Sequence, residues 1–128
     1  MNRLLLVEDD EDNLKCFTII LEAAGYDVDA YNDPAKALDV FKPHYYDILI
    51  LDYRMPRLNG LELFRRIRDL DKSARAIILT ATHERLCIDN SLDQQHRLFN
   101  IVWKPVTISK LLAEISKMIS FRNSTTSM

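Results

Sequence analysis

Short runs of large aliphatic residues alternate along the chain with longer segments in which apolar residues recur every three or four positions. Residues 48–51 (Ile-Leu-Ile-Leu) form the strongest run, which is typical of a strand buried on both faces. Residues 4–7, 76–80 and 99–103 show the same pattern, and residues 26–31 alternate as a strand at a sheet edge does. The sequence therefore predicts five strands.

A segment with helical spacing follows each predicted strand. These segments span residues 14–24, 34–41, 60–70, 84–95 and 107–119, of which residues 84–95 are poor in apolar side chains. Asp33 is a typical N-cap before Pro34, and Thr107 is a typical cap of the last helix. We expect one domain over residues 1–122, and residues 123–128 to form a disordered polar tail or the start of a linker.

Five successive strand–helix units predict an α/β fold with a parallel sheet. Because crossovers between parallel strands are right-handed, few strand orders are open to such a chain. We predict a doubly wound, five-stranded parallel sheet in the flavodoxin-like order 2-1-3-4-5, with five helices distributed over both faces. In this order the first and third strands are neighbours, and ligands bind beyond their carboxyl ends.

Composition and charge narrow the classes of function. The chain has 128 residues, of which 48% are hydrophobic and 28% charged, as in an ordinary globular domain. Because 17 basic and 19 acidic residues give a net charge of −2, we expect no direct binding of nucleic acid or of anionic lipid. No run has transmembrane length and no signal peptide opens the chain, so we expect a cytoplasmic protein with Cys16 and Cys87 as free thiols.

The predicted sheet brings polar residues together at one edge. Glu8, Asp9 and Asp52 follow the first and third strands, and Thr80 and Lys104 end the fourth and fifth. Three carboxylates and one ammonium group leave a charge of −2, which a divalent cation would neutralise. Oxygen ligands without His or Cys favour Mg²⁺, or alternatively Mn²⁺, over zinc. An Asp in such a site can itself act as the nucleophile toward a phosphoryl group.

Each of these residues also has a simpler explanation. The acids after the first strand are typical of a helix N-terminus, and Asp52 alone is typical of a turn. Thr80 alone would be an ordinary hydroxyl at a strand end, and Lys104 alone a solvated charge. Their convergence at one edge favours the functional interpretation. We expect His44, His83 and His96 to be surface residues, since no pattern in the sequence indicates a partner for them.

The motifs at the strand ends resemble those of a known family. They are Glu8-Asp9, Asp52, Met55-Pro56, Asn59-Gly60, Thr80-Ala81 and Lys104-Pro105, in this order along the chain. Over about residues 3–121, the chain resembles the response-regulator receiver domains of two-component signalling. Each motif alone is common, whereas the whole set, each member at its strand end, is specific.

The resemblance implies a phosphoacceptor site that contains Mg²⁺. Asp52 would accept the phosphoryl group. Asp9 would bind the metal directly, Glu8 directly or through water, and Arg54 through its backbone carbonyl. The domain would then be a switch that assists its own phosphorylation and dephosphorylation rather than an enzyme.

The resemblance also implies roles for the residues that end the fourth and fifth strands. Thr80 would bond to a phosphoryl oxygen, and the small Ala81 would leave room for the group. Lys104 would pair first with Asp52 and then with the phosphate, and the Lys104–Pro105 peptide bond would be cis.

The partners implied by the resemblance are a sensor histidine kinase or a histidine phosphotransferase. The signal would pass through the face of the fourth helix, fifth strand and last helix to an unknown output domain or protein. A dimer through that face is one arrangement the resemblance allows, and no membrane is involved.

Two features depart from the family pattern. Ile101 stands where the family usually has an aromatic residue, and residues 93–98 replace a Gly- and Ala-rich link. Because Ile101 is stiff about χ1, we expect the switch to depend on the fourth helix and residues 81–85. The alternative is that Ile101 is ordinary core and that activation is weak.

Three rival functions conflict with particular residues of this chain. A Mg²⁺-dependent phosphohydrolase usually has a second Asp two residues after the nucleophile, where this chain has Arg54. A degenerate receiver domain used as a binding scaffold would lack an acid, Thr80 or Lys104. A flavodoxin would need a phosphate-binding loop after the first strand, where acids would repel the phosphate.

Overall fold

The computed structural model describes residues 2–81 and 99–126. Its strands are β1 (Arg3–Val7), β2 (Asp27–Tyr31), β3 (Ile48–Asp52), β4 (Ala76–Ala81) and β5 (Phe99–Lys104). Its helices are α1 (Glu11–Ala23), α2 (Pro34–Asp39), α3 (Gly60–Leu70) and α5 (Ile108–Thr126). All five predicted strands and four of the five predicted helices are present. The remaining helix, predicted over residues 84–95, lies outside the described residues.

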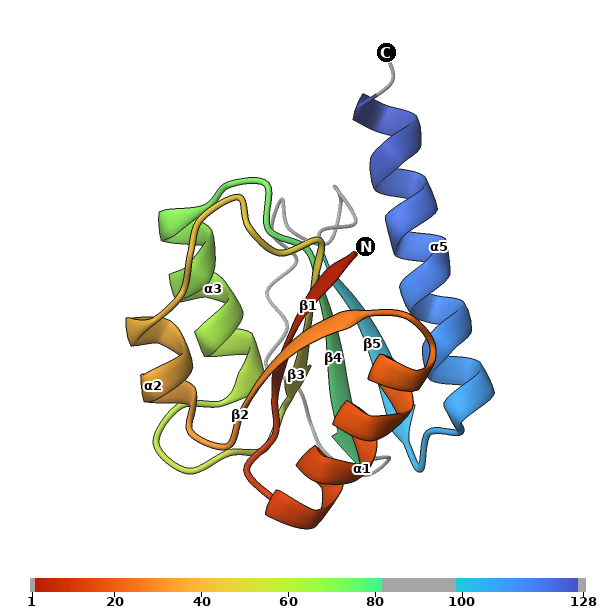
Figure 1. Ribbon diagram of the computed structural model, residues 1–128. Helices are drawn as coiled ribbons and strands as arrows, with labels where there is room; N and C mark the ends of the chain where they lie inside the picture. The colour runs from red at the N-terminus through yellow and green to blue at the C-terminus, as the bar shows by residue number, and fades with distance from the viewer. Residues whose placement is uncertain (1, 82–98, 127–128) are drawn as a thin grey trace.

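The five strands form one parallel sheet in the order β2-β1-β3-β4-β5, which confirms the predicted topology. Strand β2 lies at the edge, as its alternating pattern indicated. Helices α1 and α5 cover one face of the sheet, and α2 and α3 cover the other (Figure 1). None of the helices within the described ranges is long and apolar enough to cross a membrane.

Both faces of the sheet are buried, which explains why the central strands are aliphatic without alternation. Leu5, Leu49 and Phe64 belong to the apolar cluster beneath α2 and α3. Leu6 and Ile50 point the other way, into the cluster beneath α1 and α5. Successive side chains of β1 and β3 therefore serve two cores, and the sheet is held from both sides.

Side-chain caps explain where the helices begin. The carboxylate of Asp10 accepts hydrogen bonds from two backbone N–H groups in the first turn of α1. Asp33 and Asn59 cap α2 and α3 in the same way, and Pro34 occupies the first turn of α2. The Thr107 hydroxyl accepts a hydrogen bond from the backbone N–H of Lys110 at 3.1 Å. The polar residues that follow the strands therefore cap the helices that come next in the chain.

Two helix ends differ from the sequence prediction. Helix α2 ends at Asp39 rather than at Phe41, although the Phe41 side chain is still buried. Helix α5 continues to Thr126, past the start of the expected polar tail at residue 123. Once a helix has formed, each further residue adds at little cost, and no Gly or Pro follows Pro105 to stop it.

A buried carboxylate joins two loops at the amino-terminal edge of the sheet. Asp71, which is 3% exposed, accepts hydrogen bonds from the backbone N–H of His44 at 2.8 Å and from the Ser73 hydroxyl at 2.6 Å. His44 has a φ of 62°, a left-handed conformation that this contact helps to hold. The expectation that His44 is a surface residue is confirmed, although no sequence pattern indicated its contact with Asp71. His83 and His96 lie outside the described residues.

Candidate functional site

The carboxyl ends of β1, β3, β4 and β5 surround a hollow of about 340 Å³ that opens to solvent. It is lined by Glu8, Asp9, Asp10, Asn13, Asp52, Arg54, Thr80, Ala81 and Lys104. Every residue that the sequence predicted for the site is among them. The strand order places them together, because β1 and β3 are neighbours and β4 and β5 follow on one side.

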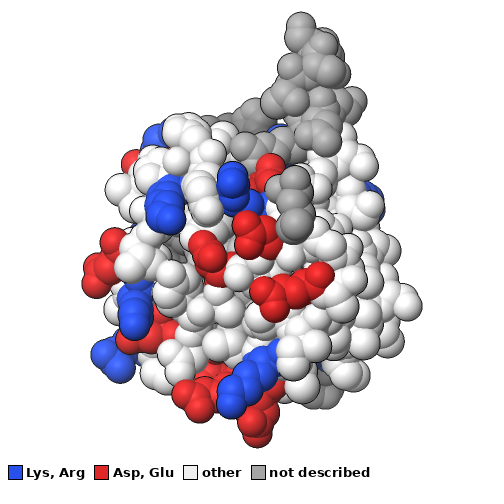
Figure 2. All heavy atoms as spheres, in the orientation of Figure 1, with Lys and Arg blue, Asp and Glu red and all other residues white. Residues whose placement is uncertain are grey.

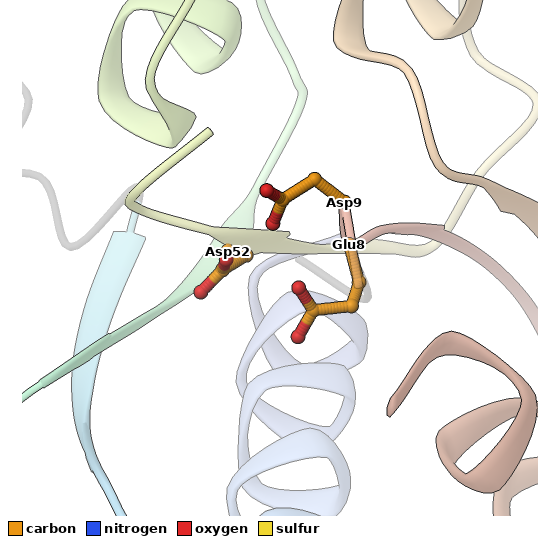
Figure 3. A group of neighbouring side chains, drawn as sticks. All are labelled: Glu8, Asp9 and Asp52. Carbon is orange, nitrogen blue, oxygen red and sulfur yellow. The ribbon is translucent and has the colours of Figure 1, made fainter. Parts of the chain in front are cut away.

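Three carboxylates form the acidic centre of the hollow. Glu8, Asp9 and Asp52 each offer an oxygen atom that lies within 4.8 Å of the others. Figure 3 shows the Glu8 and Asp9 side chains leaving adjacent positions with their carboxylates on the side of Asp52. Glu8 and Asp52 are 2% and 5% exposed, whereas Asp9 is at the surface. Two buried acids and one accessible acid therefore share a single site.

Lys104 supplies the positive charge nearest to these acids. Its Nζ donates a hydrogen bond to Asp52 Oδ1 at 2.7 Å and lies 3.7 Å from Glu8 Oε1. The Lys104–Pro105 peptide bond is cis, as the family resemblance implied. A single ammonium group thus binds one oxygen of Asp52. Its one positive charge cannot balance the two negative charges of Asp52 and Glu8 when both are ionised.

Glu8 has an oxygen atom without a hydrogen bond. Its Oε2 accepts a hydrogen bond from the backbone N–H of Asp10 at 3.3 Å, whereas Oε1 is buried and has no donor within hydrogen-bond distance among the described residues. Burial, together with the charge of Asp52, raises the pKa of Glu8 from 4.5 to about 7. A buried carboxylate oxygen in this state requires a proton or a cation.

The pKa values of Asp52 and Lys104 are also shifted, for related reasons. Burial raises the pKa of Asp52, although the hydrogen bond and charge of Lys104 oppose the shift. Burial alone would lower the pKa of Lys104, but its contacts with Asp52 and Glu8 outweigh this and raise it. Lys104 is therefore held in the charged form beside Asp52.

Thr80 and Arg54 complete the hollow. Thr80 is 1% exposed and ends the buried part of β4, where it lies opposite Trp103 of β5 in the strand register. Arg54 is exposed and follows Asp52 by two residues. The next residue after Thr80, Ala81, is small and exposed. Thr80, Ala81 and Arg54 thus form the rim of the hollow, to which they contribute a hydroxyl group, a methyl group and a guanidinium group.

Gly60 determines how closely α3 approaches the end of β3. A Cβ atom at this position would lie 2.5 Å from the backbone oxygen of Asp52 and 3.2 Å from the Cα atom of Tyr53. The Gly60 backbone N–H donates a hydrogen bond to the Tyr53 carbonyl at 2.9 Å. Because Gly60 has no side chain, the first turn of α3 can approach and hydrogen-bond to the backbone that follows Asp52.

The residues of the site fit a hard divalent cation. The ligand atoms on offer are carboxylate oxygens, one of which is buried without a hydrogen bond. Such oxygens suit Mg²⁺, and the rim leaves room for the water molecules that Mg²⁺ retains. Acidic side chains also gather around the start of α1, at the lower end of the view in Figure 2.

Sequence patterns missed the contributions of three residues to the site, two of which line the hollow. The acids after the first strand were interpreted as typical of a helix N-terminus, and no motif placed Asp10 or Asn13 in the hollow, because their place there depends on the path of α1. Gly60 was noted only as part of the Asn59-Gly60 motif, while its close approach to Asp52 depends on the distance between α3 and β3. The Asn59-Gly60 turn motif was the available signal for the last of these.

Comparisons with known proteins agree with the geometry. The family model described as response regulator receiver domain matches residues 4–116. The response regulator ArlR of Staphylococcus aureus is 34% identical over 119 residues, which are 93% of this chain and 53% of that protein. The chain thus spans about half the length of this curated relative.

Solved structures show the same fold. A response regulator receiver domain protein from Clostridium thermocellum is 25% identical with a TM-score of 0.83, covering 98% of this chain and 99% of that one. A chain in the complex of histidine kinase ThkA with response regulator protein TrrA is 29% identical with a TM-score of 0.75, covering 92% and 98%. This chain belongs to the response regulator receiver domain family of two-component signalling.

Proposed function

We propose that the domain is a phosphoacceptor switch in which Asp52 accepts a phosphoryl group. The observation that carries the proposal is the buried, unbonded Glu8 Oε1 in a group of three carboxylates, with Lys104 2.7 Å from Asp52. Such a site carries more negative than positive charge. A divalent cation would balance this charge and orient the incoming phosphoryl group. The donor would be a phosphohistidine of a kinase or phosphotransferase, or a small phosphodonor.

In the proposed reaction, a carboxylate oxygen of Asp52 forms a bond to phosphorus. The bond from phosphorus to the donor's leaving atom breaks, and its electron pair departs with the leaving group. Glu8, Asp9, Asp52 and the Arg54 carbonyl would hold Mg²⁺ or Mn²⁺, which supplies charge neutralisation for the incoming phosphate. Lys104 would turn from Asp52 to a phosphoryl oxygen, and Thr80 would donate its hydroxyl hydrogen to another.

The proposed output is a change in the surface that contains β5 and α5, read by an output domain or a partner protein. The solved complex of a histidine kinase with a related response regulator supports the proposed kinase partner. A dimer through the same surface would be one form of this output.

Intact-mass measurement with a small phosphodonor tests the phosphorylation site. We expect a gain of one phosphoryl group in the presence of Mg²⁺, and no gain in Asp52→Asn or with EDTA. A mass gain that persists in Asp52→Asn would assign the modification to another residue and overturn the proposal.

A further inference from the structure

The hollow reaches from Asp52 to the first turn of α1, where Asn13 lines its wall. Its volume of about 340 Å³ is many times the roughly 30 Å³ that one water molecule occupies in the liquid. The space therefore accommodates more than a cation and a phosphoryl group. The remainder of a small phosphodonor, its leaving group, would occupy the same hollow during the transfer.

The Asn13 side chain is not used by the helix cap. Asn13 is the third residue of α1, a position whose side chain often reaches back to the N-cap backbone N–H. That N–H, of Asp10, donates instead to Glu8 Oε2, and the Asn13 backbone N–H donates to Asp10 Oδ1 at 3.0 Å. Within residues 2–81 and 99–126, the Asn13 side-chain amide has no hydrogen-bond partner.

The charges around the hollow make an uncharged donor useful. Four of its lining residues are acids, and Lys104, one of its two basic residues, already donates to Asp52. The amide of Asn13 can donate through Nδ2 and accept through Oδ1 without adding charge. An acyl phosphate releases a carboxylate, whose oxygens need donors and are repelled by acids. A phosphoramidate releases an amine, which has no such need.

We propose that Asn13 contacts the leaving group of the phosphodonor and favours acyl phosphates over phosphoramidates. This inference rests on the proposed function, because it concerns the donor in the phosphorylation of Asp52. With an acyl phosphate, the Asp52 oxygen bonds to phosphorus, the bond between phosphorus and the acyl oxygen breaks, and the carboxylate leaves with the electron pair. Asn13 Nδ2 donates a hydrogen bond to that carboxylate.

The test compares two donors on variants of one exposed residue. Initial rates of Asp52 phosphorylation are measured by intact mass with acetyl phosphate and with phosphoramidate, in Mg²⁺, for the parent, Asn13→Ala and Asn13→Asp. Asp12→Asn, an exposed helix residue that does not line the hollow, is the matched control. Beryllofluoride affinity, measured by calorimetry, reports on the phosphoryl position without a leaving group.

We expect the ratio of the acetyl phosphate rate to the phosphoramidate rate to fall about tenfold in Asn13→Asp and about fivefold in Asn13→Ala, the effect of losing one hydrogen bond to a developing charge. Beryllofluoride affinity should stay within about twofold in Asn13→Ala, and Asp12→Asn should match the parent in all measurements. An unchanged ratio, or equal losses with both donors, would overturn the inference. If neither donor modifies the parent, the inference is overturned, because it requires an acyl phosphate to react at Asp52. The proposed function fails as well if a phosphohistidine donor also leaves Asp52 unmodified.

Discussion

At the scale of single residues, Glu8 combines burial with a carboxylate oxygen that has no hydrogen-bond donor among the described residues. A buried carboxylate oxygen without a hydrogen bond destabilises the fold, because burial removes water that nothing replaces. The pKa of Glu8 is raised from 4.5 to about 7, so the folded state binds this proton more tightly than the unfolded state does. In metal-free protein, the contribution of Glu8 to stability is therefore fully present below its unfolded pKa and is lost as the pH rises through about 7.

Glu8→Gln should stabilise the metal-free protein under alkaline conditions. In EDTA at about pH 8, we expect the free energy of unfolding to rise by on the order of 2 kcal/mol, because Gln cannot ionise. The difference should shrink toward about pH 5, where Glu8 of the parent is protonated. Urea denaturation followed by circular dichroism measures both values, with the exposed Asp12→Asn as the control. A loss of stability in Glu8→Gln at the higher pH would mean that the charged carboxylate is stabilising.

Glycine is required at positions 60 and 25 for different physical reasons: close packing at Gly60 and a positive φ at Gly25. Substitution of each by alanine measures the two effects separately. At Gly60, a Cβ atom would lie 2.5 Å from the Asp52 carbonyl, so Gly60→Ala should lose about 1–3 kcal/mol by overpacking, despite the better helix propensity of alanine. Gly25 has a φ of 99° and open space around it, so Gly25→Ala should lose about 1 kcal/mol through backbone strain alone.

Phosphorylation distinguishes the two glycine variants. If Asp52 is the phosphoacceptor, as proposed, Gly60→Ala should also slow its phosphorylation, because the backbone that carries Asp52 must move, while Gly25→Ala should leave the rate unchanged. Denaturation curves and intact-mass kinetics on both variants test this. Parent-like stability of Gly60→Ala would show that α3 can withdraw from β3 without cost.

At the scale of elements, the connection from β3 to α3 contains a strained turn. Arg57 has a φ of 71°, and the backbone N–H of Leu58 donates to the Pro56 carbonyl at 2.8 Å, which closes a γ-turn around Arg57. The Arg57 side chain is exposed, while Leu58 is buried beneath the turn. The buried Leu58 and Met55 hold the connection in place, and a positive φ at a non-glycine residue is the cost.

Arg57→Gly should therefore stabilise the domain by about 1 kcal/mol, because glycine adopts a positive φ without strain. Arg57→Ala keeps the Cβ atom and should give no gain, so the pair isolates the backbone effect from the loss of the charge. Thermal denaturation of both variants against the parent is sufficient. Equal changes in the two variants would assign the effect to the guanidinium group instead.

The link between Asp71 and the loop of residues 40–47 has a pH dependence opposite to that of Glu8. Burial alone would raise the pKa of Asp71, but hydrogen bonds from Ser73 and His44 outweigh it and hold the pKa below its usual value. The stability that this carboxylate contributes is therefore present above its unfolded pKa and is lost as the pH falls. The hydrogen bonds to the carboxylate thus tie the two loops together at neutral pH.

Asp71→Asn should lower the free energy of unfolding by about 2 kcal/mol at neutral pH, because an amide NH₂ group cannot accept a backbone N–H. The difference from the parent should decrease below about pH 4, as Asp71 of the parent takes up a proton. Asp69→Asn, which changes an exposed acid near the end of α3, is the control. A difference that stays constant from neutral to acid pH would exclude the charge as the cause.

The elements that could be predicted are those whose signals are local. Residues 48–51 predicted a doubly buried strand because all four side chains are aliphatic, and the strand order then placed Asp52 beside Glu8. The link from Asp71 to His44 could not be predicted, because it joins residues 27 positions apart through a left-handed turn with no glycine. The turn at Arg57 was missed for the same reason, since nothing in the residue type indicates a positive φ.

At the scale of the whole molecule, the sheet connects the site to an exposed surface on β5. Asp52 of β3 lies opposite Leu79 of β4 in the strand register, and the next residue, Thr80, lies opposite Trp103 of β5. Thr80 is buried beside the hollow, whereas Trp103 is 46% exposed. A movement of Thr80 toward a phosphoryl group would therefore be transmitted across one pair of strands to the surface that contains β5.

Trp103 is the only tryptophan of the chain, so its fluorescence reports on this surface without ambiguity. We expect beryllofluoride with Mg²⁺ to change its emission in the parent. Thr80→Ala should bind beryllofluoride within a few-fold of the parent affinity, on the order of one lost hydrogen bond, but show little change in emission. Thr80→Ser keeps the hydroxyl group and should respond as the parent does. If Thr80→Ala binds beryllofluoride and its emission still changes fully, the signal reaches β5 without Thr80. Lys104 would then be the route to test, because it ends β5 and its ammonium group contacts Asp52 directly.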